Sequence, residues 1–293
     1  MKRLIAILLL TPIILLGAFA TFLYVGNEAH RDISYLDTDG CSMDIYLPRR
    51  IDTKEPQGVI IFIHGGSWSS GDKSDEALRC RLLASLGYVT ASLNYTLWSE
   101  DTRHEYRVTD VLDEIDAAIL KASDFLRERG IASGKVALAG YSAGGHLALL
   151  YSYKRAETSP LDIAFVCSMA GPSEISESVW GRDMAKRVGT RLTGVEITDG
   201  MLDSGEADEL LASVSPTSFV TPDSPPTLLM HGGKDTTVPV ANAESLLALL
   251  DLNGVAHDYV YMDRSDHMLI QNPFAHLTYF KLLVEYCREY FPE

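Results

Sequence analysis

Short apolar segments that alternate with helical patterns constrain the fold of this chain more than any other feature. The apolar segments are GVIIFI, YVTASL, KVALAG, IAFVCSMAG, TLLMHG and HDYVYMD, and most are separated by helical patterns. Strands that are apolar along their whole length are buried on both faces, which is typical of mostly parallel sheets covered by helices. We therefore predict an α/β fold, with active residues at the carboxyl ends of the strands.

Local signals place most of the other elements. The segment ISYLDTDGCSMDIYLPRR alternates around turn residues and predicts an antiparallel pair of strands. Helical patterns cover approximately residues 75–86, 107–129, 144–154, 240–252 and 273–290.

Residues 172–226 do not fit this alternation. The segment is acidic in places and ends in the turn-rich sequence TPDSPP. Long insertions in compact domains often close over a site as lids, and a solvated excursion is the alternative. We therefore expect one α/β domain over residues 27–293 with a lid-like insertion at 172–226.

Residues 1–26 are almost entirely apolar after Lys2 and Arg3. At roughly 1.5 Å per residue, a helix over residues 4–25 spans a hydrocarbon core of about 30 Å. A cleaved signal peptide is the alternative, because residues 18–20 have the small-x-small form of a cleavage site. Basic residues favour the cytoplasmic side. We therefore expect a protein that is membrane-anchored with residues 27–293 outside the cytoplasm, or secreted if the leader is cleaved.

Charge and cysteine spacing exclude other classes of function. The formal net charge of -15 argues against a phosphate-binding surface, so nucleic acid is not an expected partner. The four cysteines lie far apart with no paired ligand spacing, so no metal site is expected. Cys167 lies within an apolar run and is interpreted as a packed core thiol.

The stretch KVALAGYSAGGHLALL places one serine, Ser142, between a predicted strand and a predicted helix. Residues 140–144 match G-x-S-x-G in the strand-turn-helix context that gives this motif its meaning. The sharp turn requires glycine on both sides of the serine, because larger side chains would collide. Amides at the start of the following helix can stabilise an anionic intermediate. Ser142 is therefore the candidate nucleophile, and a purely structural turn is the alternative.

A serine nucleophile needs a histidine base and an acid that orients the histidine. Asp235 follows the apolar run TLLMHGGK, and His267 follows HDYVYMD in the loop RSDH. The order Ser142, Asp235, His267 is the nucleophile, acid, base order of α/β hydrolases. Asp263 and Asp266 are alternative acids, although their closeness in sequence to His267 disfavours the required geometry.

The sequence HGGSW follows the apolar strand GVIIFI directly. Glycines there let the backbone approach a substrate, and successive N–H groups can converge on an oxyanion. Gly66 and Ser67 are the expected donors, joined by the N–H of Ala143. Trp68 and Tyr141 flank the reacting centre in sequence and are candidates for an acyl or alcohol pocket, with core packing as the alternative.

The order of these motifs resembles that of a known family. The segments HGGSW, SGDK, NYTLWSE, GYSAGGHLA, HGGKDTTVP and SDH are similar to motifs of the α/β-hydrolase esterases, both the hormone-sensitive-lipase type and the HGG-x-W acetyl-esterase and arylformamidase-like enzymes. The resemblance covers about Tyr46 to Phe291. It implies hydrolysis of small carboxylic esters, usually with short acyl groups, without a cofactor. It also implies Ser142 as nucleophile, Asp235 as acid and His267 as base.

Two departures from the lipase-like branch are visible. Ser67 replaces the third glycine of HGGG, which leaves the backbone donors in place, and NYTLWSE replaces the more usual NYRLAPE, which loses an arginine and a proline that brace this loop. Two other functions remain open. One is a serine peptidase or amidase of the prolyl-oligopeptidase-like or arylformamidase-like kind, and the other is a membrane-tethered interaction protein without catalysis.

Overall fold

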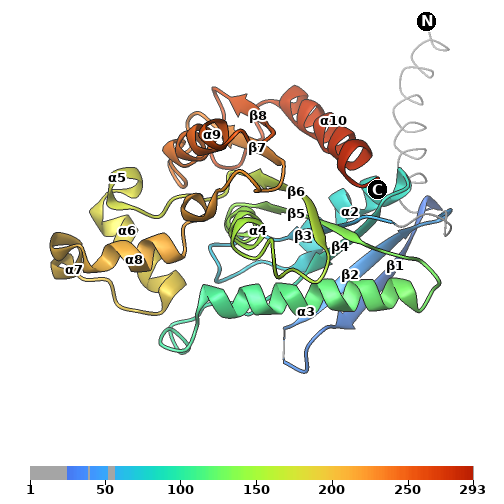
Figure 1. The fold of residues 1–293 in the computed structure, drawn as a ribbon, viewed down its shortest axis with the longest axis horizontal. Helices are drawn as coiled ribbons and strands as arrows, with labels where there is room; N and C mark the ends of the chain where they lie inside the picture. Colours follow the sequence, from blue (N-terminus) through green and yellow to red (C-terminus); the bar gives the residue numbers. More distant parts are fainter. Residues whose placement is uncertain (1–24, 39, 52–56, 293) are drawn as a thin grey trace, which may run out of the picture.

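A twisted eight-stranded sheet forms the centre of the described molecule (Figure 1). The computed structural model describes residues 25–38, 40–51 and 57–292. Along the sheet the strand order is β1-β2-β4-β3-β5-β6-β7-β8. The strands are β1 (Asn27–Ser34), β2 (Ser42–Pro48), β3 (Val59–Ile63), β4 (Val89–Leu93), β5 (Lys135–Tyr141), β6 (Asp162–Met169), β7 (Thr227–Gly232) and β8 (His257–Met262).

The parallel or antiparallel pairing of neighbouring strands agrees with the pairing expected from the sequence. β1 pairs with β2, and β2 with β4, in antiparallel fashion. All pairs from β4 through β3, β5, β6 and β7 to β8 are parallel. Every residue of β3, β4 and β7 is buried, which explains why β3 is apolar throughout rather than alternating. The predicted α/β fold with a mostly parallel sheet is confirmed.

The helices match the patterns read from the sequence, with ends that differ by a few residues. Pro273 and Asn272 begin the last helix, since proline suits the first helical turn and the asparagine side chain accepts from the N–H of Ala275. The helical segments are η1 (Lys73–Glu76), α2 (Ala77–Ser85), α3 (Val108–Arg127), α4 (Ala143–Lys154), α5 (Glu177–Trp180), α6 (Arg182–Thr193), α7 (Asp199–Ser204), α8 (Glu206–Ser213), η2 (Pro216–Phe219), α9 (Ala241–Asn253) and α10 (Pro273–Tyr290).

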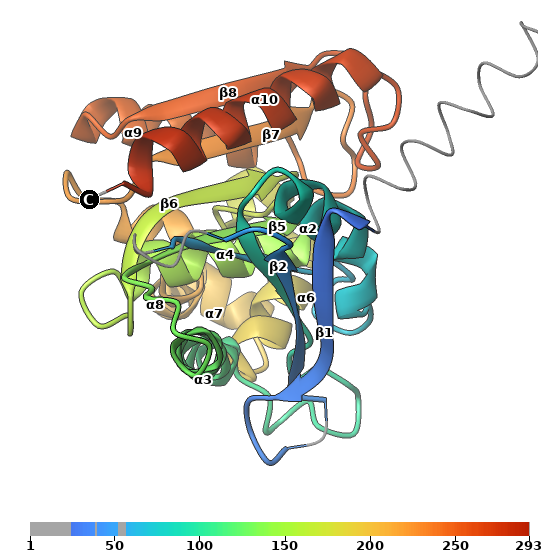
Figure 2. The same cartoon turned by 90° about the vertical axis from the view of Figure 1, so that its right-hand side faces the viewer.

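Helices cover both faces of the sheet. Buried side chains of α3, α4 and α9 pack in one cluster, and those of α2 and α10 pack in a second cluster on the other face. Figure 2 shows α3 and α10 on opposite sides of the sheet. Cys167 is fully buried in the second cluster, which confirms its interpretation as a core thiol.

The segment between β6 and β7 leaves the sheet and forms α5, α6, α7 and α8, which lie together at one end of the molecule (left in Figure 1). It corresponds to the insertion that breaks the alternation in the sequence. His146 of α4 holds the base of this segment, because its Nε2 donates to the carbonyl oxygen of Val214 at 2.8 Å. Lys154, at the end of α4, donates to the carbonyl oxygen of Ser213 at 2.9 Å.

The turn from β5 into α4 is possible only with glycine on both sides of Ser142. A Cβ atom on Gly144 would lie 1.9 Å from the carbonyl oxygen of Ile63, and one on Gly140 would lie 2.3 Å from the carbonyl carbon of Gly144. Ser142 itself has φ 54° and ψ -120°, a strained conformation for a residue with a side chain. The start of α4 is thus pressed against the end of β3.

The predicted leader, residues 1–26, lies outside the described residues except for Val25 and Gly26. No helix within residues 25–38, 40–51 and 57–292 is long and apolar enough to cross a membrane.

Substituting Gly144 tests the close approach of α4 and β3. We expect Gly144→Ala to lower the free energy of unfolding by at least about 2 kcal/mol, because the added methyl group overlaps backbone atoms that cannot move independently. Gly134→Ala is the matched control, since a Cβ there meets no atom within 4 Å, and a change within about 0.5 kcal/mol is expected. Urea unfolding of the full chain measures both. Equal midpoints for the two variants would contradict the described turn.

The buried imidazole of His146 predicts a loss of stability in acid. Burial lowers the pKa of His146 from 6.5 to about 4. Between about pH 6.5 and pH 4, His146 therefore binds a proton in the unfolded chain but not in the folded chain. The free energy of unfolding consequently falls as the pH drops from 6.5 to 4. We expect His146 to account for roughly 3 kcal/mol of this fall. Urea unfolding at pH 7 and pH 4 should show a smaller fall for His146→Gln than for the natural protein, and an identical fall would refute the assignment.

Candidate active site

Ser142 lies at the point where β5 ends and α4 begins, at the carboxyl edge of the parallel strands. Its backbone N–H donates to the carbonyl oxygen of Met169 on β6 at 2.8 Å, which fixes the turn against the neighbouring strand. The residue is 8% exposed. A hydroxyl on a rigid, strained turn of this kind points away from the sheet toward whatever covers the strand ends.

His267 joins Ser142 and Asp235 in one chain of hydrogen bonds. Its Nε2 lies 2.9 Å from Ser142 Oγ, and its Nδ1 lies 2.7 Å from Asp235 Oδ2. Because an ionised carboxylate only accepts hydrogen bonds, the proton of the neutral ring lies on Nδ1, and Nε2 accepts from the serine hydroxyl. The structure thus brings together the three residues that sequence order singles out, from the ends of β5, β7 and β8.

The Asp235 carboxylate is held by more than the histidine. Its Oδ1 accepts from the backbone N–H of Thr237 at 2.9 Å and of Val238 at 2.8 Å, and its side chain is fully buried. These bonds orient Oδ2 toward His267. His231 lies beside the same carboxylate, but its Nε2 donates to the carbonyl oxygen of Val238 at 3.0 Å, and burial lowers its pKa.

The two alternative acids do not reach the histidine. Asp263 pairs with Arg264 at 3.6 Å, and Asp266 Oδ1 accepts from the backbone N–H of Met268 at 3.0 Å. Both carboxylates therefore contact residues of the loop that carries His267. Asp235 follows the neighbouring strand, and its Oδ2 faces Nδ1 of the histidine.

The loop after β3 presents backbone N–H groups near the serine. Gly66, Ser67 and Trp68 all have positive φ, at 115°, 53° and 60°. The carbonyl oxygen of Gly66 accepts from the N–H groups of Ser69 and Ser70, which closes a tight turn. Within the described part of the chain, no hydrogen bond engages the N–H groups of Gly66 and Ser67 or that of Ala143 at the start of α4. Free donors of this kind suit an oxyanion.

A cavity of about 210 Å³ opens beside Ser142. Trp68 lines it, and its Nε1 donates to His146 Nδ1 at 3.2 Å, so the indole is fixed from behind by α4. The other lining residues are Ser67, Ala143, Pro172, Trp180, Met184, Arg187, Val188, Arg191, Thr237 and Val238. The candidate role of Trp68 as a wall of the pocket agrees with this placement.

Tyr141 does not line this cavity. Its hydroxyl donates to the carbonyl oxygen of His267 at 2.7 Å, and its ring lies 5.3 Å from the imidazole. The side chain needs a partner for its hydroxyl and finds one on the histidine loop, which places it behind His267 rather than around the substrate. The expectation of a pocket role for Tyr141 therefore gives way to a contact that positions the histidine loop.

Sequence patterns miss the part of the cavity that the insertion builds. Trp180 of α5 and Met184, Arg187, Val188 and Arg191 of α6 all line it. Their helical spacing is visible in the sequence, but nothing local to α6 indicates that this face points at Ser142.

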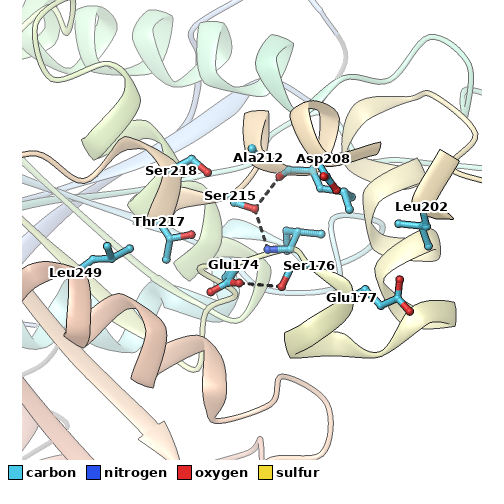
Figure 3. Close-up of a pocket in the computed structure, with 12 residues that line it drawn as sticks. Glu174, Ser176, Glu177, Leu202, Asp208, Ala212, Ser215, Thr217, Ser218 and Leu249 are labelled. Atoms are coloured by element: carbon cyan, nitrogen blue, oxygen red, sulfur yellow. Dashed lines mark hydrogen bonds between the residues drawn. The ribbon is translucent and has the colours of Figure 1, made fainter. Parts of the chain in front are cut away.

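A second cavity, of about 420 Å³, lies between the insertion and α9 and does not include Ser142 (Figure 3). Ser215 Oγ accepts there from the N–H of Ile175 and donates to the carbonyl oxygen of Leu211, and Ser176 donates to Glu174. None of its lining side chains buries a polar atom without a partner.

No cluster of three or more His, Cys, Asp or Glu side chains in the described ranges is arranged to hold a metal ion.

Comparisons with known proteins agree with this fold. Esterase LipC of Mycobacterium tuberculosis is 28% identical over 255 residues, which cover 80% of this chain and 60% of LipC. The chain thus spans less than two thirds of this relative. A truncated carbohydrate esterase from gut microbiota has the same fold, with a TM-score of 0.71 at 17% identity, covering 89% of this chain and 97% of that one.

Esterase B of Lactobacillus rhamnosis, solved with a C4-C4 tributyrin phosphonate inhibitor, superposes with a TM-score of 0.70 at 21% identity, covering 96% of this chain and 94% of that one. These likenesses confirm the fold and the resemblance seen in the sequence. The sequence pattern of the BD-FAE family matches residues 43–250, which is more than two thirds of the chain. The protein therefore belongs to the BD-FAE family and has the α/β-hydrolase fold.

Proposed function

We propose that this protein is a carboxylic ester hydrolase in which Ser142 is the nucleophile, His267 the general base and Asp235 the residue that orients the base. The observation that carries the proposal is the continuous hydrogen-bonded chain from Ser142 Oγ through the imidazole to the Asp235 carboxylate. Membership of a family with esterase relatives supports the reaction class.

In the first step, the serine oxygen attacks the ester carbonyl while its proton passes to Nε2 of His267. The positive imidazolium that forms is stabilised by Asp235, whose second oxygen is already held by two backbone N–H groups. The negative charge on the tetrahedral intermediate is taken up by the N–H groups of Gly66, Ser67 and Ala143, which have no other partner in the described chain.

In the second step, the imidazolium gives its proton to the departing alcohol, and an acyl group remains on Ser142. Water then attacks this acyl-enzyme with His267 again acting as base, which releases the acid and restores the serine. No cofactor enters either step. A serine peptidase would use the same three residues, but no observation on this cavity favours a peptide over an ester.

We also propose that the acyl group is short. The cavity beside Ser142 has a volume of about 210 Å³, below the roughly 300–1,000 Å³ of pockets that enclose drug-sized ligands. The bulky side chains of Trp68, Trp180 and Met184 line it. The C4 inhibitor of esterase B fits the same interpretation.

The insertion at 172–226 is proposed as the wall and cover of this pocket, because α5 and α6 supply lining residues to it. We also propose that residues 1–26 direct the protein to a membrane, as an anchor or as a cleaved signal peptide. The apolar leader at residues 1–26, with Lys2 and Arg3 before it, supports a protein whose catalytic domain lies outside the cytoplasm, either anchored or secreted after cleavage.

Hydrolysis of p-nitrophenyl acetate, butyrate and decanoate by the full chain tests the proposal. We expect acetate or butyrate to be the best substrate. Ser142→Ala should reduce kcat by several orders of magnitude, comparable to the roughly 10⁶-fold loss known for another serine enzyme. Asp235→Asn should cost about 10⁴-fold, because the imidazole then loses the acceptor that sets its tautomer.

Asp266→Asn is the matched control for the acid, because Asp266 carries the same group in the same region but contacts only the backbone of its own loop. Its kcat should stay within about threefold of the natural value. Equal losses for Asp235→Asn and Asp266→Asn, or an active Ser142→Ala protein, would overturn the assignment.

A further inference from the structure

Two arginines of α6 lie between the Ser142 cavity and a larger outer groove. Arg187 and Arg191, one helical turn apart, line both the 210 Å³ cavity and the adjoining groove of about 950 Å³. Neither makes an ion pair with any carboxylate in the described part of the chain. Arg187 is exposed, and its hydrogen bond is a weak one to the sulfur of Met184 at 3.6 Å.

The neighbouring cations are neutralised, which makes this pair distinct. Arg182 contacts Glu177, Asp199 and Asp203, and Lys186 lies 2.7 Å from Asp199. The chain as a whole has a formal net charge of -15, so carboxylates are abundant. Two cations without a partner carboxylate at the mouth of the active site are therefore unexpected in a protein of this charge.

Arg191 is held in place and still has unused donors. Its Nη1 donates to the carbonyl oxygen of Ser67 at 2.9 Å, and its guanidinium lies over the ring of Trp98 with 4.2 Å to the centroid. Its Nε and the Nε1 of Trp98 are buried and have no hydrogen-bond partner among the described residues. Buried donors without a partner cost free energy, and together they mark a place where an acceptor is missing.

The positive charges of Arg187 and Arg191 also act on each other. Burial lowers the pKa of Arg191, Tyr106 and Glu100 act in the opposite direction, and the repulsion from Arg187 is a smaller effect that lowers the pKa again. An anion between the two guanidiniums would remove their mutual repulsion and supply acceptors. Planar guanidinium groups match carboxylates particularly well, because two parallel hydrogen bonds form at once.

We propose that the ester substrate carries an anionic group, of which a carboxylate is the best match, and that Arg187 and Arg191 bind it while the ester carbonyl lies at Ser142. The proposal rests on ester hydrolysis as the function of this site. Both arginines border the inner cavity and the outer groove, so the charge belongs close to the ester, on its acyl or its alcohol side.

Matched pairs of esters that differ in one charge test this proposal with the full chain. For the alcohol side, 4-acetoxybenzoate is compared with 4-acetoxybenzamide. For the acyl side, mono-4-nitrophenyl glutarate is compared with 4-nitrophenyl glutaramate, after subtraction of the rate seen with Ser142→Ala. At low salt we expect kcat/KM for the anionic ester to exceed that of its neutral partner by about tenfold in at least one pair, mainly through KM.

Removal of either guanidinium should weaken this preference. We expect Arg187→Gln and Arg191→Gln each to reduce the anionic-to-neutral ratio by roughly fivefold. The ratio isolates charge recognition, because loss of the Arg191 contact with Ser67 lowers the rates of both esters together. Arg127→Gln, which removes the same charge from an exposed position on α3, is the matched control and should leave the ratio unchanged.

Two results would overturn the proposal: natural-protein ratios at or below 1 in both pairs, or ratios that neither Arg187→Gln nor Arg191→Gln changes. In both cases the neutral esters are still hydrolysed, so the failure concerns charge recognition alone. If no ester of any kind is hydrolysed, the proposed function itself fails and the inference with it. Calorimetric titration of the Ser142→Ala protein gives a readout without turnover, with tighter binding expected for 4-acetoxybenzoate than for 4-acetoxybenzamide.

Discussion

The close contact between the start of α4 and the end of β3 is the constraint on which the site depends. Gly144 lies where any side chain would overlap the carbonyl oxygen of Ile63, so α4 can pack directly against the strand. This contact forces Ser142 into its strained turn and brings Ala143 beside the loop of Gly66 and Ser67. The proposed nucleophile and the proposed oxyanion donors are therefore placed by one backbone arrangement, before any substrate binds.

Much of the fold and the central site could be predicted from the sequence because their signals are local. Strands buried on both faces are apolar throughout, so β3 and β7 are recognisable as parallel strands without any partner in view. A strand end followed by a loop also predicts where polar residues gather, which is how Asp235 and His267 could be assigned. Because all parallel strands have their carboxyl ends at the same edge of the sheet, the residues that follow them lie close together.

Features that arise from packing between distant segments could not be predicted. The face of α6 that carries Arg187 and Arg191 meets the cavity only because the insertion folds back across the strand ends. Trp98 occupies the segment that differs from the usual NYRLAPE and packs against the guanidinium of Arg191. Tyr141 was ambiguous for the same reason, since a residue beside the nucleophile in sequence can face the pocket or the histidine loop.

The central claim is that Ser142 is an activated nucleophile, and covalent labelling tests it most directly. The full chain is treated with a fluorophosphonate, digested and mapped by mass spectrometry, beside a His267→Ala variant. The account predicts a single adduct on Ser142 in the natural protein and much slower labelling without the base. A folded protein that takes up no label, or one labelled at another serine, would contradict it.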